Sequence, residues 1–282
     1  MKFRFRALIV LFFLISVTGC VAEPTPASDL SNPTATVPPV MEVPAETQAA
    51  ETESTPQSKN EAQNLIRFDE MGISVGFDYP EGFSQSITTS VLGVYEPQAP
   101  FDLPYPQNSR ILFTGYPGSS GDFNANGIRV FRAEEVNALE TGALESLYAV
   151  LDGQTDHHSD FPRMAGAGSL IDAQLIPLAF QSGNGYRYLF TKSFSADPLA
   201  DTTLTYMYQG VTSDEKYFVS FIMSVDAPFL GEFIGQTLTT PEEFEAYYQN
   251  INSRTESATG DQFTPSLIVL DELISSIIIL EE

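Results

Sequence analysis

Residues 203–225 read TLTYMYQGVTSDEKYFVSFIMSV. This stretch holds two runs rich in aromatic and β-branched residues, residues 203–211 and 217–225, on either side of the polar segment TSDEK. Such runs favour strands, and a short polar connection between them is typical of a hairpin. The stretch therefore predicts two neighbouring antiparallel strands, around which the rest of the fold can be placed.

A second pair of runs precedes this stretch. Residues 173–181 and 186–194 flank Asn184-Gly185, a dipeptide that tolerates the positive φ angles of a tight hairpin turn. We therefore expect four consecutive strands joined by short turns, which form an antiparallel meander. Earlier strands are expected where apolar and polar residues alternate or where turn residues bound an apolar run, at residues 73–79, 84–95, 110–116 and 127–132.

Three amphipathic helices are expected beside these strands. Apolar residues recur at three- and four-residue intervals over residues 136–151, which predicts the first helix. The second begins at the capping box TPEE, residues 240–243, and the third at TP, residues 264–265. We interpret the final IIIL, residues 277–280, as part of the third helix's apolar face. The expected fold class is α+β, an antiparallel β-sheet flanked by helices.

Three segments resemble the PsbP-like fold. They are VGFDYPEGF at residues 75–83, YMYQGVTSDEKYFVSF at residues 206–221 and LIVLDELISSI at residues 267–277. The fold is shared by extrinsic subunits of photosystem II, a Ran-binding nuclear import factor and many bacterial lipoproteins. The resemblance implies an α/β/α sandwich. It implies no activity, because its motifs build the core, and no photosynthetic or Ran-binding residue can be placed on this sequence.

The N-terminus has the parts of a secretion signal. Lys2, Arg4 and Arg6 precede an apolar run at residues 7–17, which is shorter than the about 20 residues that span a bilayer. The next residues, Val17-Thr18-Gly19-Cys20, resemble a bacterial lipobox, and this resemblance implies cleavage before Cys20 and a diacylglycerol on its thiol. The alternative is an ordinary signal peptide followed by an incidental cysteine. Cys20 is the single cysteine of the chain, so no intramolecular disulfide can form.

The domain organisation follows from composition. Residues 1–19 are the expected signal peptide, and residues 20–64, rich in proline, threonine and acidic residues, are expected to form a disordered tether. Residues 65–282 are then a single globular domain, a monomer on the extracytoplasmic face of the cell membrane. An ordered N-terminal subdomain is the alternative to the tether. The formal net charge of −24 argues against nucleic acid as a partner.

Two short motifs carry metal-ligand residue types. The segment TDHHSD places Asp156, His157, His158 and Asp160 within five positions, although it lacks the spacings of known zinc motifs. It is either a metal site or a solvated polar loop. The chain contains neither a GxSxG nucleophile motif nor a complete glycine-rich dinucleotide loop, so we expect no cofactor.

The second motif is DFNANG, residues 122–127. Asp122, Asn124 and Asn126 reproduce the opening of a calcium-binding loop, which presents oxygen ligands at alternate positions. The twelfth position is Ala133, where such loops carry a bidentate glutamate, and the flanks are expected to be strands. The alternative is a hairpin turn rich in Asn and Asp.

Two classes of function remain. The favoured one is a membrane-anchored lipoprotein that acts as a binding or assembly module and presents one sheet face to a protein partner. The expected exposed residues of that face are Arg187, Thr191 and Ser193. The alternative is an extracytoplasmic metal-dependent hydrolase that uses the TDHHSD segment. A solute-binding lipoprotein of a transporter is a third hypothesis, although such proteins usually have two lobes and a longer chain.

Overall fold

The computed structural model describes residues 62–97, 104–117, 126–139, 141–159, 161, 168–193, 195 and 197–282. Cys20, the expected signal peptide and nearly all of the expected tether lie outside them, as do Asp122, Asn124 and Asp160.

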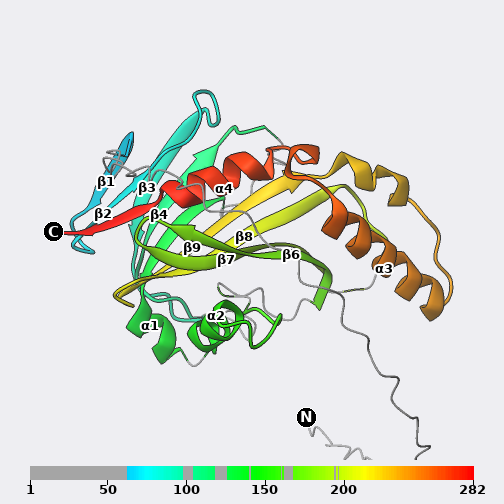
Figure 1. Ribbon diagram of the computed structural model, residues 1–282, viewed down its shortest axis with the longest axis horizontal. Coiled ribbons are helices and arrows are strands. Elements are labelled where there is room, and N and C mark those ends of the chain that lie inside the picture. The colour runs from blue at the N-terminus through cyan, green and yellow to red at the C-terminus, as the bar shows by residue number, and fades with distance from the viewer. Residues whose placement is uncertain are drawn as a thin grey trace, which may run out of the picture. The chain divides into compact units, whose positions relative to one another are not determined.

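The described residues form a seven-stranded antiparallel sheet in the order β3-β4-β5-β9-β8-β7-β6. Its last four strands are consecutive in sequence, which confirms the expected meander (Figure 1). The strands are β3 (Ser86–Leu92), β4 (Asn108–Thr114), β5 (Gly127–Arg132), β6 (Gly168–Phe180), β7 (Gly183–Ser193), β8 (Thr203–Thr212) and β9 (Tyr217–Asp226).

Helices cover both faces of this sheet (Figure 1). One face carries α3 (Pro241–Ser257) and α4 (Leu267–Ser276), and the other carries α1 (Ala133–Ala138) and α2 (Ala143–Leu151). Two short 3₁₀ helices, η1 (Pro228–Phe233) and η2 (Gly260–Gln262), lie before α3 and α4. The expected α+β class is therefore confirmed. Among the described residues, none of the helices combines the length and hydrophobicity that crossing a bilayer requires.

Each covered face has its own hydrophobic core. Side chains along a strand point alternately to the two faces, so successive residues of one strand enter different cores. In β9, Phe221 and Met223 pack on the α3/α4 side, whereas Phe218 and Ile222 pack on the α1/α2 side. The central strands therefore bury apolar residues on both faces, and we call these two sides the α3/α4 face and the α1/α2 face.

A second, three-stranded antiparallel sheet joins the two ends of the described chain in the order β1-β2-β10. It consists of β1 (Asn64–Phe68), β2 (Ile73–Phe77) and β10 (Ile278–Glu281). The interpretation of the final IIIL as a helix face is wrong, because α4 ends at Ser276 and the next residues pair with β2. Ser182 holds the new strand, since its hydroxyl accepts a hydrogen bond from the Ile279 amide at 2.8 Å.

The predicted turn at Asn184-Gly185 is also misplaced. The hairpin turns at Gln181 and Ser182, and both predicted turn residues lie inside β7. Gly185 is needed there for close packing, because a Cβ atom at this position would lie 2.5 Å from the Tyr208 hydroxyl oxygen and 2.2 Å from the Gln209 carbonyl oxygen. Glycine at this position therefore indicates a strand that packs closely against a tyrosine side chain, and not a turn.

The predicted helix over residues 136–151 is divided into α1 and α2. Gly142 lies between them with a φ of 69°, a left-handed conformation that a continuous helix excludes. Near the C-terminus, the capping box at Thr240 is confirmed, but α4 begins at Leu267 with Ser266 as its cap. Thr264 cannot cap it, because its backbone pairs with Asp226 at the end of β9.

Candidate functional site

Asn126 is the one candidate calcium ligand of the motif that the structure describes. It is buried, and its side-chain oxygen accepts a hydrogen bond from the Ser224 amide at 3.1 Å. Its carbonyl oxygen accepts another from the Phe113 amide at 3.0 Å. Asn126 therefore links β4 and β9 at the start of β5, because its side-chain oxygen bonds to one strand and its backbone oxygen bonds to the other.

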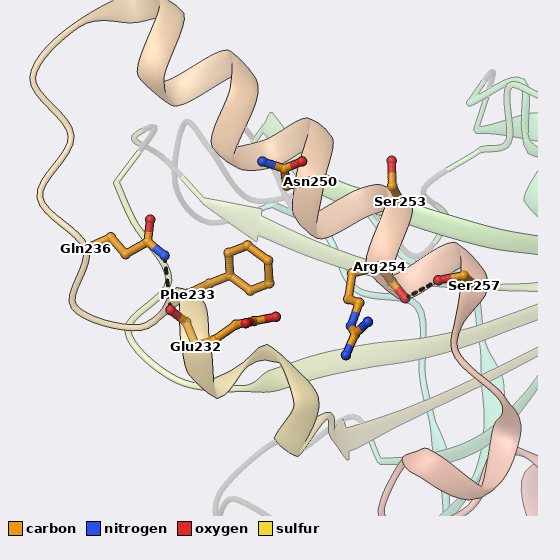
Figure 2. Close-up of a pocket in the computed structure, with 7 residues that line it drawn as sticks. All are labelled: Glu232, Phe233, Gln236, Asn250, Ser253, Arg254 and Ser257. Atoms are coloured by element: carbon orange, nitrogen blue, oxygen red, sulfur yellow. Dashed lines mark hydrogen bonds between the residues drawn. The ribbon is translucent and has the colours of Figure 1, made fainter.

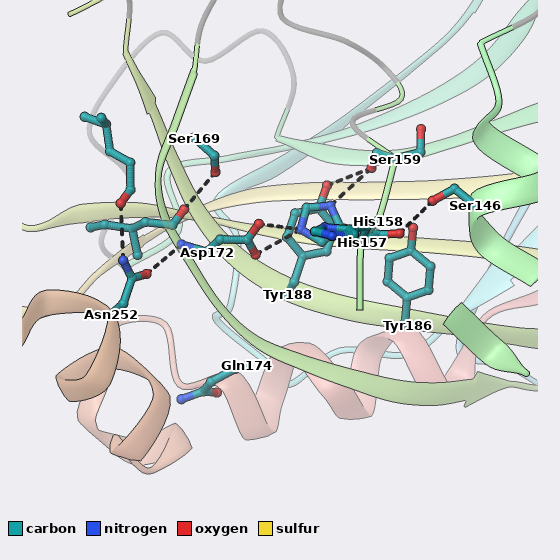
Figure 3. Close-up of polar contacts among 12 residues, drawn as sticks. Ser146, His157, His158, Ser159, Ser169, Asp172, Gln174, Tyr186, Tyr188 and Asn252 are labelled. Carbon is teal, nitrogen blue, oxygen red and sulfur yellow. Dashed lines mark hydrogen bonds and ion pairs between the residues drawn. The ribbon is translucent and has the colours of Figure 1, made fainter. Parts of the chain in front are cut away.

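The two histidines of TDHHSD have different environments (Figure 3). His157 is exposed, whereas the His158 side chain is only 6% exposed. The His158 ring stacks on Tyr188 of β7 with centroids 3.6 Å apart, and its Nε2 lies 2.9 and 2.8 Å from the two carboxylate oxygens of Asp172 on β6. Asn252 of α3 in turn accepts a hydrogen bond from the Asp172 amide.

The His158–Asp172 pair resembles the base and orienting acid of a catalytic triad, but its third partner does not fit. The other ring nitrogen, Nδ1, lies 3.4 Å from the backbone carbonyl oxygen of Ser159, and not beside a hydroxyl group that could act as a nucleophile. The described residues also hold no group of three or more His, Cys, Asp or Glu side chains suited to a metal ion. The observed geometry fixes a loop onto the sheet.

Neighbouring contacts hold the same loop. The Tyr188 hydroxyl and the Gln209 amide both donate hydrogen bonds to the Ser159 carbonyl oxygen, at 3.2 and 3.0 Å. The Ser146 hydroxyl of α2 donates to the His157 carbonyl oxygen at 3.1 Å. Phe161 is buried against the α1/α2 core. Side chains of two strands and one helix therefore anchor this segment, which the sequence alone presented as a solvated loop.

Arg187, expected on an exposed sheet face, is instead 5% exposed on the α3/α4 face. Its guanidinium donates to the side-chain and backbone oxygens of Gln174, at 2.8 and 3.3 Å, and its Nε lies 3.3 Å from Asp271 on α4. The prediction was wrong because it took one sheet face as solvated. Leu189, on the same face of β7 and fully buried, is the sequence signal that both faces are covered.

Thr191 and Ser193, the other two residues of the expected face, lie near the end of β7 and are half-buried. The Thr191 hydroxyl donates to the Thr203 carbonyl oxygen, and the Ser193 hydroxyl accepts from the Ser195 amide. The structure therefore does not bring the three residues together into an exposed contact surface.

Gln174 organises the buried network around Arg187. It lies in an irregularity of β6 with a φ of 56°, which is uncommon for a residue other than glycine. Its side-chain amide donates to the carbonyl oxygens of Thr255 and Ala258, at 2.8 and 2.9 Å, at the C-terminal end of α3. One side chain thus satisfies helix carbonyls and holds an arginine.

Burial dominates the electrostatics of this network. Burial raises the pKa of Asp271 above its ordinary value, although the nearby Arg187 charge and a hydrogen bond from Tyr206 act in the opposite direction. Burial also raises the pKa of Tyr206 well above its usual value, and the negative charge of Asp271, 2.7 Å from its hydroxyl, raises it further. Desolvation of a buried ion pair can exceed its Coulombic gain, and the raised pKa of Asp271 is consistent with that balance.

A surface hollow of about 440 Å³ lies between η1 and α3 (Figure 2). Its lining residues are exposed and polar, apart from the half-buried ring of Phe233. Glu232 and Arg254 face this hollow from opposite sides, and neither side chain has a hydrogen-bond or ion-pair partner among the described residues. The remaining lining residues are Gln236, Asn250, Ser253 and Ser257.

We name this surface the η1–α3 hollow. Local sequence patterns do not reveal it, because its two walls come from segments separated by a linker. The available signal was Arg254 itself, one of only 13 basic residues against 37 acidic ones. No family model, curated protein or solved structure matches the chain, so the site must be judged on its own geometry.

The His158 contacts predict a difference between the two histidines. Replacing His158 by Asn should lower the free energy of unfolding by about 1–2 kcal/mol, through loss of the Tyr188 stack and of a hydrogen bond to the half-exposed Asp172. The matched variant His157→Asn should stay within about 0.5 kcal/mol of wild type, as exposed substitutions do. Urea unfolding measures both. Equal effects would show that the stack and the bond contribute nothing.

The raised pKa of Asp271 predicts the sign of a second substitution. The pKa of the Asp271 carboxyl is higher in the folded protein than in the unfolded chain. Ionisation of this carboxyl as the pH rises therefore lowers the free energy of unfolding. Asp271→Asn avoids this cost and keeps an acceptor for Tyr206. The variant should therefore be at least as stable as wild type at neutral pH, and the two should converge as the pH falls below the ordinary carboxyl pKa.

The control for this prediction is Asp271→Ala, which removes the acceptor of the Tyr206 hydroxyl and should destabilise the fold by about 1 kcal/mol or more. Chemical unfolding followed from acidic to neutral pH compares the three proteins. A neutral-pH stability of Asp271→Asn well below that of wild type would mean that the ion pair with Arg187 outweighs burial.

Proposed function

We propose that the chain is a lipid-anchored extracytoplasmic lipoprotein whose folded domain is a binding or assembly module for a protein partner. The lipobox-like Val17-Thr18-Gly19-Cys20 supports the anchor, with diacylglycerol on Cys20 as the link to the membrane. We further propose that the domain is PsbP-like. Its antiparallel sheet with helices on both faces is the arrangement that this resemblance implies.

The observation that carries the binding proposal is the η1–α3 hollow. Glu232 and Arg254 present charges of opposite sign beside the ring of Phe233, and the described residues leave both charges unpaired. Arginine and aromatic side chains are enriched at protein interfaces, where a few such residues contribute much of the binding free energy. The polar lining differs from the mainly apolar lining of small-molecule pockets, so it favours a protein partner.

The position of this hollow also replaces the earlier hypothesis of an exposed sheet face. Both faces of the meander carry buried apolar side chains, so the central strands cannot meet a partner directly. A partner must therefore bind at the outer surface of the covering elements. The hollow lies there, on the outer side of α3 and η1, and it needs no rearrangement of the core to be reached.

The anchor proposal predicts the fate of a cysteine variant. Cys20→Ser should abolish incorporation of radiolabelled palmitate, because a serine hydroxyl cannot form the thioether to diacylglycerol. It should also prevent cleavage by the lipoprotein signal peptidase. Two acyl chains suffice for stable anchoring where one is marginal, so loss of the diacylglycerol removes the membrane link of the mature chain. Equal label in wild type and Cys20→Ser would contradict the lipoprotein assignment.

The binding proposal predicts a site-specific crosslink. A photo-reactive amino acid at Ser253, which is exposed in the hollow, should form an adduct with one partner protein in intact cells that produce the chain. The additional substitution Arg254→Glu should reduce that adduct by about tenfold, because it reverses the charge that faces the partner.

The matched control places the same amino acid at Glu145, an exposed residue of α2 on the other side of the sheet. It should give no adduct of the same mass. Absence of an adduct at Ser253, or an adduct that Arg254→Glu leaves unchanged, would exclude the hollow as the contact surface.

A further inference from the structure

A row of polar residues crosses the α1/α2 face of the large sheet. The strand registers place Ser90 opposite Arg110, Arg110 opposite Arg129, and Arg129 opposite Ser220. Ser220 in turn lies opposite Gln209. Directly opposite residues of an antiparallel sheet project to the same face, so these side chains form a continuous line over β3, β4, β5, β9 and β8.

The centre of this row is a pair of like charges. Arg110 and Arg129 are cross-strand neighbours, and like charges in that position are destabilising. Both residues are half-buried, so their guanidinium groups are partly withdrawn from water, and the Nε atom of Arg129 is buried. Phe131, two residues along β5 from Arg129, belongs to the buried core of the same face.

No carboxylate among the described residues lies within ion-pair distance of either arginine. Some other basic residues of the domain do have such partners: Arg67 contacts Asp69, and Lys216 contacts Glu281. A shortage of acidic residues cannot be the reason, since the chain carries 37 of them. The pair is therefore a local excess of positive charge inside a strongly acidic protein.

Two buried atoms of the row also have no hydrogen-bond partner among the described residues. They are Nε of Arg129 and the hydroxyl oxygen of Ser220, which are neighbours across β5 and β9. An unsatisfied buried polar group costs about 1–3 kcal/mol, and a charged one costs more. Among the described residues, the polar partner of Arg110 is Ser90, whose hydroxyl accepts a hydrogen bond of 3.3 Å from its Nε.

The electrostatic environment agrees with this geometry. Burial lowers the pKa of Arg129, the nearby Tyr105 raises it, and the positive charge of Arg110 lowers it further. Burial also raises the pKa of Tyr105, while the nearby Arg129 lowers it. An anion held between the two guanidinium groups would raise the pKa of Arg129 and so offset the effect of the Arg110 charge. It would also accept hydrogen bonds from guanidinium N–H groups.

We propose that Arg110 and Arg129 bind a small tetrahedral oxyanion, the phosphate group, either free or as a monoester. Guanidinium groups donate paired N–H groups that match phosphate oxygens, and a doubly negative ligand neutralises both charges. A nucleic-acid strand does not fit, because the net charge of −24 repels a long polyanion while it leaves one small ion bound at a local positive site.

This site is separate from the η1–α3 hollow, and the proposal does not depend on the proposed function. Isothermal titration calorimetry of the full chain at low ionic strength tests it, with inorganic phosphate and glycerol 3-phosphate as ligands. At least one of them should bind with a dissociation constant of about 1 mM or tighter. Binding of inorganic phosphate alone identifies the free ion as the ligand, whereas binding of both identifies the phosphate group of a monoester as well.

Substitutions locate the binding. Arg129→Gln and Arg110→Gln should each weaken binding by about tenfold or more, because each removes one charged fork. Arg129→Lys should recover part of the affinity, since it keeps the charge and loses the paired donors. The matched control is Arg254→Gln, which removes an equally unpaired arginine outside the row and should leave the dissociation constant unchanged.

Three results would overturn the proposal. Wild type that binds neither ligand at about 10 mM would show that the pair has no phosphate affinity. Equal weakening by Arg254→Gln and Arg129→Gln would show that only the overall charge matters. Unchanged binding in both Arg110→Gln and Arg129→Gln, with circular dichroism spectra like that of wild type, would place the ligand elsewhere.

Discussion

The large sheet is buried on both faces, and every polar side chain that projects from its central strands must find a partner inside the protein or bind something from outside. Arg187 shows the first solution. Gln174 and Asp271 surround its guanidinium, and Gln174 reaches the end of α3 at the same time. The same side chain, Gln174, therefore both holds α3 on the sheet and provides a hydrogen-bond acceptor for the buried guanidinium.

The same constraint governs the other face. His158, Tyr188 and Gln209 join a loop to the sheet through a ring stack and hydrogen bonds, so the polar atoms under that loop have partners. Further along the face, Arg110 and Arg129 stand side by side without a carboxylate among the described residues. The contacts of His158, Tyr188 and Gln209 have a structural role, since they hold the loop on the sheet. The arginine pair has no partner of opposite charge in the described part of the chain, and an anion between the two positive charges would remove their repulsion, so we assign it a ligand.

Local signals predicted much of the fold. The four-stranded meander and the capping box at Thr240 were predictable because each depends on residues close together in sequence. The prediction of a turn at Asn184-Gly185 failed because Gly185 is required for another reason: the side chain of Tyr208, on the neighbouring strand, packs against it and leaves no room for a Cβ atom. The terminal isoleucines failed because strand pairing with β2, about 200 residues away in sequence, overrides their place after a helix.

The candidate sites were less predictable than the fold. Arg187 was expected on a solvated face because alternation shows which residues share a face but not what covers it. The Arg110–Arg129 pair requires the register of β4 and β5, and the η1–α3 hollow requires the packing of a 3₁₀ helix beside α3. The TDHHSD segment was correctly placed in a loop, but only the structure shows that His158 turns inward while His157 remains exposed.

We infer that a phosphate-like ligand neutralises the unmatched charge of Arg110 and Arg129 on the α1/α2 face. Anomalous diffraction from crystals of the protein soaked in selenate, a tetrahedral oxyanion whose selenium scatters anomalously, would locate such a ligand. We expect an anomalous peak between the guanidinium groups of Arg110 and Arg129. A map with no peak there, or with a carboxylate of the chain itself between the two arginines, would rule out a phosphate-like ligand at this pair.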